Sequence, residues 1–138
     1  MVAVIPNPFV FKDATLTIAA DSYEAAISKA EIVPSSSSQT FKGASPGASW
    51  TDQSYATWVC NLEYAQDWKD PASLSNYLHE HEGEAVDAVF VPKVGTGEPS
   101  VAATLVITPG SIGGTVDAFA TSSVTLGVSG KPEIIPGA

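Results

Sequence analysis

The chain has 138 residues, of which 44% are hydrophobic and 15% are charged, so it is long enough to form one domain with a buried core. Fifteen acidic residues against six lysines give a net charge of −9, and there is no arginine. Because arginine is the preferred ligand of phosphates and guanine edges, this composition argues against tight nucleic-acid binding and against docking on an anionic membrane. The single cysteine, Cys60, excludes an internal disulfide and a cluster of thiolate metal ligands.

The N-terminal residues 1–12 are interrupted by Pro6 and Pro8, and no basic region precedes an apolar run there. They therefore do not resemble a secretory signal. No apolar stretch in the chain approaches the roughly 20 residues that span a bilayer. We expect residues 1–12 to form an arm outside the core of a protein that is made in a cytoplasm and has no membrane partner.

Short segments with alternating apolar residues, separated by Gly, Pro and Ser, dominate the chain and predict a mainly β fold. The predicted inward faces share apolar side chains at every second position: Leu16, Ile18 and Ala20; Ala56, Trp58, Cys60, Leu62 and Tyr64; Val86, Ala88 and Phe90; Val101, Ala103, Leu105 and Ile107; Val124, Leu126 and Val128. Such faces pack against one shared core. We predict a β-sandwich or barrel of antiparallel strands with one flanking α-helix.

Several predicted outward faces are not polar, since Tyr55, Val59, Val89 and Val91 would point away from that core. An isolated sandwich has little reason to expose these side chains. A covering helix or a neighbouring subunit would explain them, which is the first indication of assembly.

One helix is predicted after Asp70, which is placed to cap the first turn, with Pro71 at the first helical position. Gly83 is placed to end it, about 11 residues later. Between them an apolar stripe recurs at helical spacing, formed by Leu74, Tyr77, Leu78 and His81. A helix this short is marginal alone and must pack on the sheet.

Residues 21–33 fit two structures. Asp21 followed by Glu24 resembles a capping box, and the Ala-rich run after it favours helix. As a strand, the same segment places Tyr23, Ala25 and Ile27 on one face.

Two further segments are predicted to project from the core. Residues 34–49 contain four consecutive serines, Gly43, Pro46 and Gly47, and show no apolar periodicity. A loop this long in a compact domain tends to be functional or mobile. Residues 129–138, with Pro132 and Pro136, are expected to form a C-terminal arm.

No segment has the pattern of an active site, so we expect no catalytic residue, no cofactor and no metal. His79 and His81 are two residues apart and point away from each other on a helix, whereas helical ligands are spaced by four. The acidic run Glu80, Glu82, Glu84 and Asp87 is typical of a solvated face. Cys60 alternates with apolar neighbours and is expected to be a buried, unreactive thiol. Gly110, Gly113 and Gly114 lack the Lys-Ser/Thr of a phosphate loop and are interpreted as turns.

The order of several motifs resembles a known family. Residues 58–92 contain these motifs in order: Trp58, the run Leu62–Trp68, the run Ser73–Leu78, the pair Glu82–Gly83, and the run Val89–Pro92. Similar closing patterns occur at Gly113–Phe119 and Thr125–Pro132. Together these motifs resemble the major tail protein, or tail tube protein, of long-tailed phages infecting actinobacteria and similar hosts, over residues 14 to 135. In that family the run Ile32–Ser36 ends a strand, so the resemblance favours strand for residues 21–33.

The resemblance implies a structural protein of the virion tail, assembled in the host cytoplasm. Six copies would form a ring, and rings would stack into a tube that holds the tape measure protein and later passes DNA without specific binding. Its other partners would be the tail terminator and the distal tail or baseplate proteins. An acidic surface without arginine would let DNA slide through.

Residues are assigned to this function as candidates. For the lumen we name Glu63, Glu84 and Asp87; for contacts between subunits, Trp50, Trp68, Phe41, Tyr55 and Val59. Trp58 is expected in the core. Two alternatives remain: a tube protein of a secretion system, which shares the architecture, and a monomeric β-sandwich module that binds carbohydrate or protein.

Overall fold

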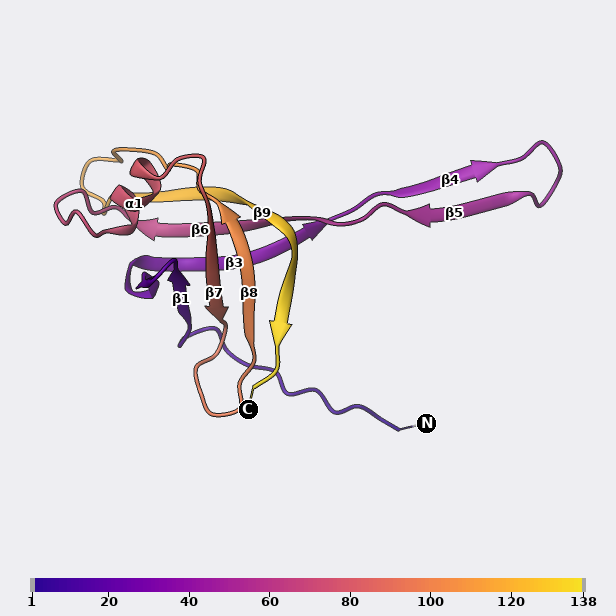
Figure 1. Ribbon diagram of the computed structural model, residues 1–138, viewed down its shortest axis with the longest axis horizontal. Helices are drawn as coiled ribbons and strands as arrows, with labels where there is room; N and C mark the ends of the chain where they lie inside the picture. Colours follow the sequence, from indigo (N-terminus) through magenta and orange to yellow (C-terminus); the bar gives the residue numbers. More distant parts are fainter. Residues whose placement is uncertain (1, 138) are drawn as a thin grey trace.

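The computed structural model describes residues 2–137, which form antiparallel strands with one short α-helix. In chain order the elements are β1 (Thr15–Ile18), β2 (Asp21–Ser22), the 3₁₀ turn η1 (Glu24–Ala26), β3 (Ile27–Ser35), β4 (Ser38–Lys42), β5 (Ser49–Gln53), β6 (Thr57–Ala65), α1 (Leu74–Glu80), β7 (Ala85–Val91), β8 (Ser100–Val106) and β9 (Thr121–Ile135). Seven strands form one sheet in the order β2-β1-β7-β8-β9-β6-β3, and β4 and β5 form a separate pair (Figure 1).

The large sheet curls on itself, so that its two ends enclose one core. Side chains of β1, β7 and β8 and side chains of β3 and β6 line the same small internal space. Leu62, Leu105 and Leu126 are almost fully buried in the core. The predicted alternation is seen in β6, β7 and β9, where every second side chain faces the core. The mainly β, sandwich-like fold with one flanking helix is therefore confirmed.

The helix begins later than predicted. Ser73, not Asp70, is its N-cap and accepts a hydrogen bond from the Asn76 amide. Asp67 accepts the amides of Lys69 and Asp70, and Asp70 accepts the amide of Ala72; these bonds fix residues 67–73 as turns, which delays the helix. Gly83 follows the helix with φ of +84°, as a C-terminal glycine does. The buried side chains Leu74 and Leu78 attach the helix to the core.

Residues 21–33 are strand apart from one short interruption. β2 and β3 are separated by the 3₁₀ turn at Glu24–Ala26, so Tyr23 and Ala25 do not share a face. Tyr23 is buried, whereas Ala25 is exposed. The Ala-rich run reaches only one helical turn, because β3 pairs with β6 along its whole length.

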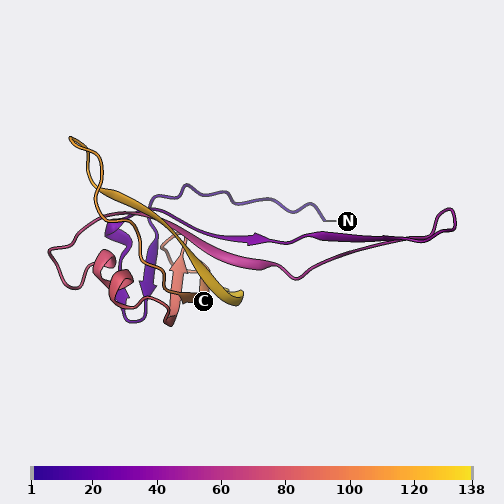
Figure 2. The same cartoon turned by 90° about the horizontal axis from the view of Figure 1, so that it is seen from above.

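The loop predicted over residues 34–49 is instead a β-hairpin. β4 and β5 pair in register from Ser38 with Gln53 to Lys42 with Ser49, and together they continue the ladder of β3 and β6 away from the body of the molecule (Figures 1 and 2). All residues of both strands are exposed. Because neither face meets a core, the sequence has no apolar alternation that reveals the strands.

The predicted C-terminal arm is also strand as far as Ile135. β9 leaves β6 after Val128 and continues beside β8, with a register shift around Ala103 and with Gly130 at φ of +81°. This bulge accommodates Pro132, which has no amide hydrogen to donate. At the other end, residues 2–12 contain no helix or strand and are exposed, and they extend in the same general direction as the hairpin (Figure 2).

Candidate assembly surfaces

The hairpin of residues 36–56 presents an aromatic pair. Phe41 and Trp50 are directly opposed in the ladder, and their ring centroids lie 5.9 Å apart. Their exposed fractions are 67% and 64%. The opposite face carries Thr40 and Thr51, whose hydroxyl oxygens lie 3.1 Å apart. Two of the predicted contact residues are thus brought together on one face of a projection.

Tyr55 and Val59, also predicted as contact residues, lie near the base of this hairpin. Tyr55 is 99% exposed and borders an open cleft shared with Trp58, Val128 and Lys131. Val59 lies on the outward face of β6, where its cross-strand partners are Val33 of β3 and Gly127 of β9. Gly127 is in turn paired with Val106 of β8. Small and apolar residues therefore cross the outward face in one row.

Trp68, the remaining contact candidate, lies just after the end of β6, whereas the hairpin precedes the start of that strand. Its indole Nε1 donates to Gln66 Oε1 at 3.0 Å, and its ring meets His79 edge-on with centroids 6.3 Å apart. Trp50 and Trp68 consequently do not form one surface within a single copy.

Gln66 also fixes the loop of residues 109–120. Its Nε2 donates to the carbonyls of Gly113 and Thr121 at 2.7 and 3.0 Å, and its Oε1 accepts the Gly113 amide at 3.0 Å. Ser122 Oγ donates to the Ser111 carbonyl at 2.8 Å. This anchored loop exposes three apolar side chains, Ile112, Val116 and Phe119, the last two by 86% and 96%.

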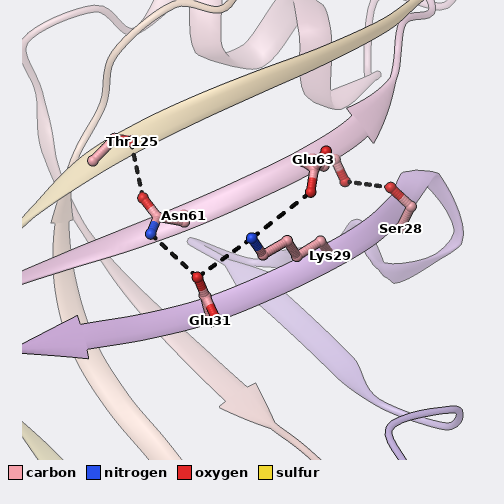
Figure 3. Close-up of polar contacts among 6 residues, drawn as sticks. All are labelled: Ser28, Lys29, Glu31, Asn61, Glu63 and Thr125. Atoms are coloured by element: carbon pink, nitrogen blue, oxygen red, sulfur yellow. Dashed lines mark hydrogen bonds and ion pairs between the residues drawn. The ribbon is translucent and has the colours of Figure 1, made fainter.

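Polar side chains form a network on the outward face of β3, β6 and β9 (Figure 3). Lys29 Nζ lies 3.5 Å from Glu31 Oε1 and 3.9 Å from Glu63 Oε2. Asn61 donates to Glu31 at 3.4 Å and accepts from Thr125 at 2.9 Å. Exposed pairs of this kind contribute little stability, and the network places the Glu63 carboxylate on this face.

The three lumen candidates do not share one surface. Asp87 lies on the same outward face as Glu63, where it accepts a hydrogen bond from Thr104 at 3.2 Å. The side chain of Glu84 instead turns to the helix and lies 2.7 Å from His81 Nδ1. A lining formed by the outward face would include Glu63 and Asp87 but not Glu84.

The two histidines lie on α1 and at its C-cap, and each contacts an aromatic ring. His79 meets Trp68, and His81 stacks on Tyr77 with centroids 4.3 Å apart. Burial raises the pKa of Tyr77, and Glu84 and Asp21 raise it further. Among residues 2–137 no group of three or more acidic, histidine or cysteine side chains is arranged to hold a metal ion.

Cys60 lies in the core with a free thiol. Burial raises its pKa from 9.0 to about 11, which keeps the thiol protonated and unreactive at neutral pH. Burial likewise raises the pKa of Tyr23 to about 12, with the nearby Asp21 adding to the effect.

Comparison with known proteins assigns no family to the chain. No protein-family model matches it, and no curated protein matches it. Within the described residues, no helix is both long and apolar enough to cross a membrane.

The sequence interpretation missed the 109–120 loop and its anchor. The glycines there are interpreted as turns, and Gly113–Phe119 as a motif of the resemblance, but Ile112, Val116 and Phe119 show no periodicity that assigns them to a face. The signal that could have revealed this surface is the presence of three apolar side chains in a segment that has one charged residue and no strand-like alternation.

Proposed function

We propose that this chain is a structural subunit that assembles into rings, with six copies to a ring as the resemblance to phage tail tube proteins implies, and that the rings stack into a tail tube. The observation that carries the proposal is the hairpin of residues 36–56. It projects from the body and is exposed on both faces. A lone two-stranded hairpin is only marginally stable in water, so its exposed aromatic pair is best explained by burial against a neighbouring copy.

Two further features support self-assembly. β3 is the last strand of the large sheet in the described chain, and its far edge has no partner. Open edges of this length invite pairing with another chain. The row of small and apolar residues across the outward face supplies a second surface that is not typical of a monomer.

The proposed tube would lie in the virion tail and contact the tape measure, tail terminator and distal tail or baseplate proteins. Its lumen would pass DNA without specific contacts, because a chain with net charge −9 and no arginine repels phosphates. Glu63 and Asp87, on one face, are the residues that would contribute to this repulsion.

The hairpin is tested by replacing residues 36–56 with Asn-Gly, a two-residue turn that suits the antiparallel pair Ser35 and Thr57. We expect the shortened protein to keep its melting temperature and to form no rings or tubes in negative-stain micrographs. Assembly as in the intact chain would overturn the proposal, and so would loss of folding, because the hairpin would then be part of the core.

A matched pair of variants narrows the test to the two hairpin faces. Phe41→Ser with Trp50→Ser removes the aromatic pair, whereas Thr40→Ser with Thr51→Ser changes the opposite face and keeps both hydroxyls. Only the first variant is expected to raise the concentration required for assembly. Equal effects of the two variants would show that the aromatic face has no special role.

A second candidate function is a monomeric module that binds carbohydrate. The observation that favours it is the full exposure of Tyr55 beside the cleft with Trp58, since sugar rings stack on exposed aromatic side chains. A protein that stays monomeric and loses glycan binding in the Tyr55→Ala variant would support this function over the tube.

A further inference from the structure

The two ends of the molecule carry different surfaces. We define the head surface as residues 2–12 and 36–56, and the tail surface as residues 66–84 and 109–120. The hairpin and the tail loop lie at opposite ends of the long axis in both views (Figures 1 and 2). A contact between head and tail therefore requires a second copy.

Both surfaces expose apolar side chains. The head exposes the largest set, namely Val2, Val4, Ile5, Phe9, Val10, Phe11, Phe41, Trp50 and Tyr55. The tail exposes Trp68, Ile112, Val116 and Phe119. Phe11 packs partly on Phe90 and Trp68 on His79, but most of the other side chains in both sets are exposed by more than half, and both surfaces are more apolar than a solvated surface requires.

The tail loop is held in place rather than left free. Gln66 bonds Gly113 and Thr121, and Ser111 bonds Ser122. Asp117 adopts φ of +67°, a conformation that costs energy for a residue other than glycine. The loop is held in place although it exposes Val116 and Phe119. A partner that packs on these two side chains would explain this order.

The charges of the two surfaces are complementary. The head carries Lys12 and Lys42 against Asp52, a net charge of +1. The tail carries six acids against Lys69, a net charge of −5; the acids are Asp67, Asp70, Glu80, Glu82, Glu84 and Asp117. Two tails repel each other, whereas a head placed on a tail does not.

We infer that the head surface of one copy docks on the tail surface of the next copy, with the hairpin tip beside the 109–120 loop. The inference rests on the proposed function and adds the surface that receives the hairpin. The contact joins different surfaces of identical chains, so it can repeat from copy to copy. Because head and tail lie at opposite ends of the long axis, the repeat extends a stack of rings. A symmetric dimer, in which like surfaces meet, is not expected.

Cross-linking between two cysteine variants tests this contact. Ser45→Cys places a thiol in the turn of the hairpin, and Val116→Cys places one on the tail loop. Cys60 is buried with a pKa of about 11, so it adds no background. Each variant is checked for an unchanged melting temperature, the two are mixed in equal amounts, and a short bismaleimide is added.

We expect the mixture to give cross-linked dimers several-fold above either variant alone. A control mixture pairs Ser45→Cys with Ser28→Cys, which lies in β3 outside both surfaces, and is expected to give the background level. Dimers of Ser45→Cys with itself, or equal yields in both mixtures, would overturn the inference. Negative-stain micrographs of the same samples separate the two proposals: tubes without the specific cross-link overturn only this contact, and absence of any assembly overturns the proposed function as well.

Discussion

Replacement of Gln66 by alanine perturbs the tail loop at one side chain. Gln66 makes four side-chain hydrogen bonds: two to the carbonyls of Gly113 and Thr121, one from the Gly113 amide and one from the Trp68 indole. A typical intramolecular hydrogen bond contributes about 0.5–1.5 kcal/mol. Because these groups lie near solvent and water replaces part of each bond, the lower half of that range applies. We expect Gln66→Ala to lower the free energy of unfolding by about 2–4 kcal/mol.

Urea unfolding measures the global loss, and amide exchange at Gly113 measures the local one. The Gln66 backbone amide keeps its bond to the Ala120 carbonyl at 2.9 Å, so the end of β6 should remain in place while the loop opens. Exchange at Gly113 should therefore accelerate more than exchange in β6. Trypsin does not cleave this loop, which has no lysine, so a protease with broad specificity is the complementary probe.

Gln66→Glu is the matched variant, because it keeps an acceptor for the Gly113 amide and for Trp68. It cannot donate to the two carbonyls and places a carboxylate against them, so we expect a loss at least as large as that of alanine. An alanine variant within about 0.5 kcal/mol of the intact protein, with unchanged exchange at Gly113, would refute this account of the loop. So would a glutamate variant as stable as the intact chain.

Three further predictions concern the core. Leu126→Ala, at a side chain with no exposed area, should cost about 2–5 kcal/mol in urea unfolding; Thr125→Ala, on the outward face, should cost about 1 kcal/mol or less, and equal losses would contradict the alternation of β9. Gly110→Ala would direct a methyl group at the Tyr64 hydroxyl and should cost about 1–3 kcal/mol. Adding Tyr64→Phe, which removes that hydroxyl, should restore the lost stability. Between pH 9 and 11 the stability should fall, because the folded protein holds the Cys60 proton more tightly than the unfolded chain does. That contribution, at most about 3 kcal/mol, is complete below pH 9 and lost as pH rises through 11, and the Cys60→Ala variant should show a flatter profile.

The core strands were predictable because each has one buried face. In β6 the residues Trp58, Cys60, Leu62 and Tyr64 face the core while their neighbours face outward. The sequence therefore shows apolar residues at every second position. The location of the helix in the chain was predictable, but the residue at which it begins was not. Asp67, Asp70 and Ser73 are all good caps, and only the hydrogen bonds of the turn select Ser73.

The hairpin and the end of β9 were not predictable by the same method. β4 and β5 bury neither face, so no pattern of apolar residues distinguishes them from a loop. Their strands are set by register, since they continue the pairing of β3 with β6. β9 extends past Pro132 because a bulge at Gly130 accommodates it, and bulges depend on the partner strand.

The candidate contact residues were predictable as residue types but not as a surface. Trp50, Phe41 and Tyr55 lie on the hairpin or at its base, and Trp68 lies beyond the opposite end of β6. Nothing in their spacing along the sequence separates these two groups. The separation follows from the direction in which the β3–β6 ladder extends.

Assembly of this chain into rings and tubes is observed most simply by electron microscopy of the intact protein at rising concentration. Sedimentation velocity on the same samples reports the mass of the particles. We expect rings and then tubes about 100 Å wide, a width scaled from six domains of this size. A single monomeric species at every concentration and salt, with no ring in the micrographs, would contradict this expectation.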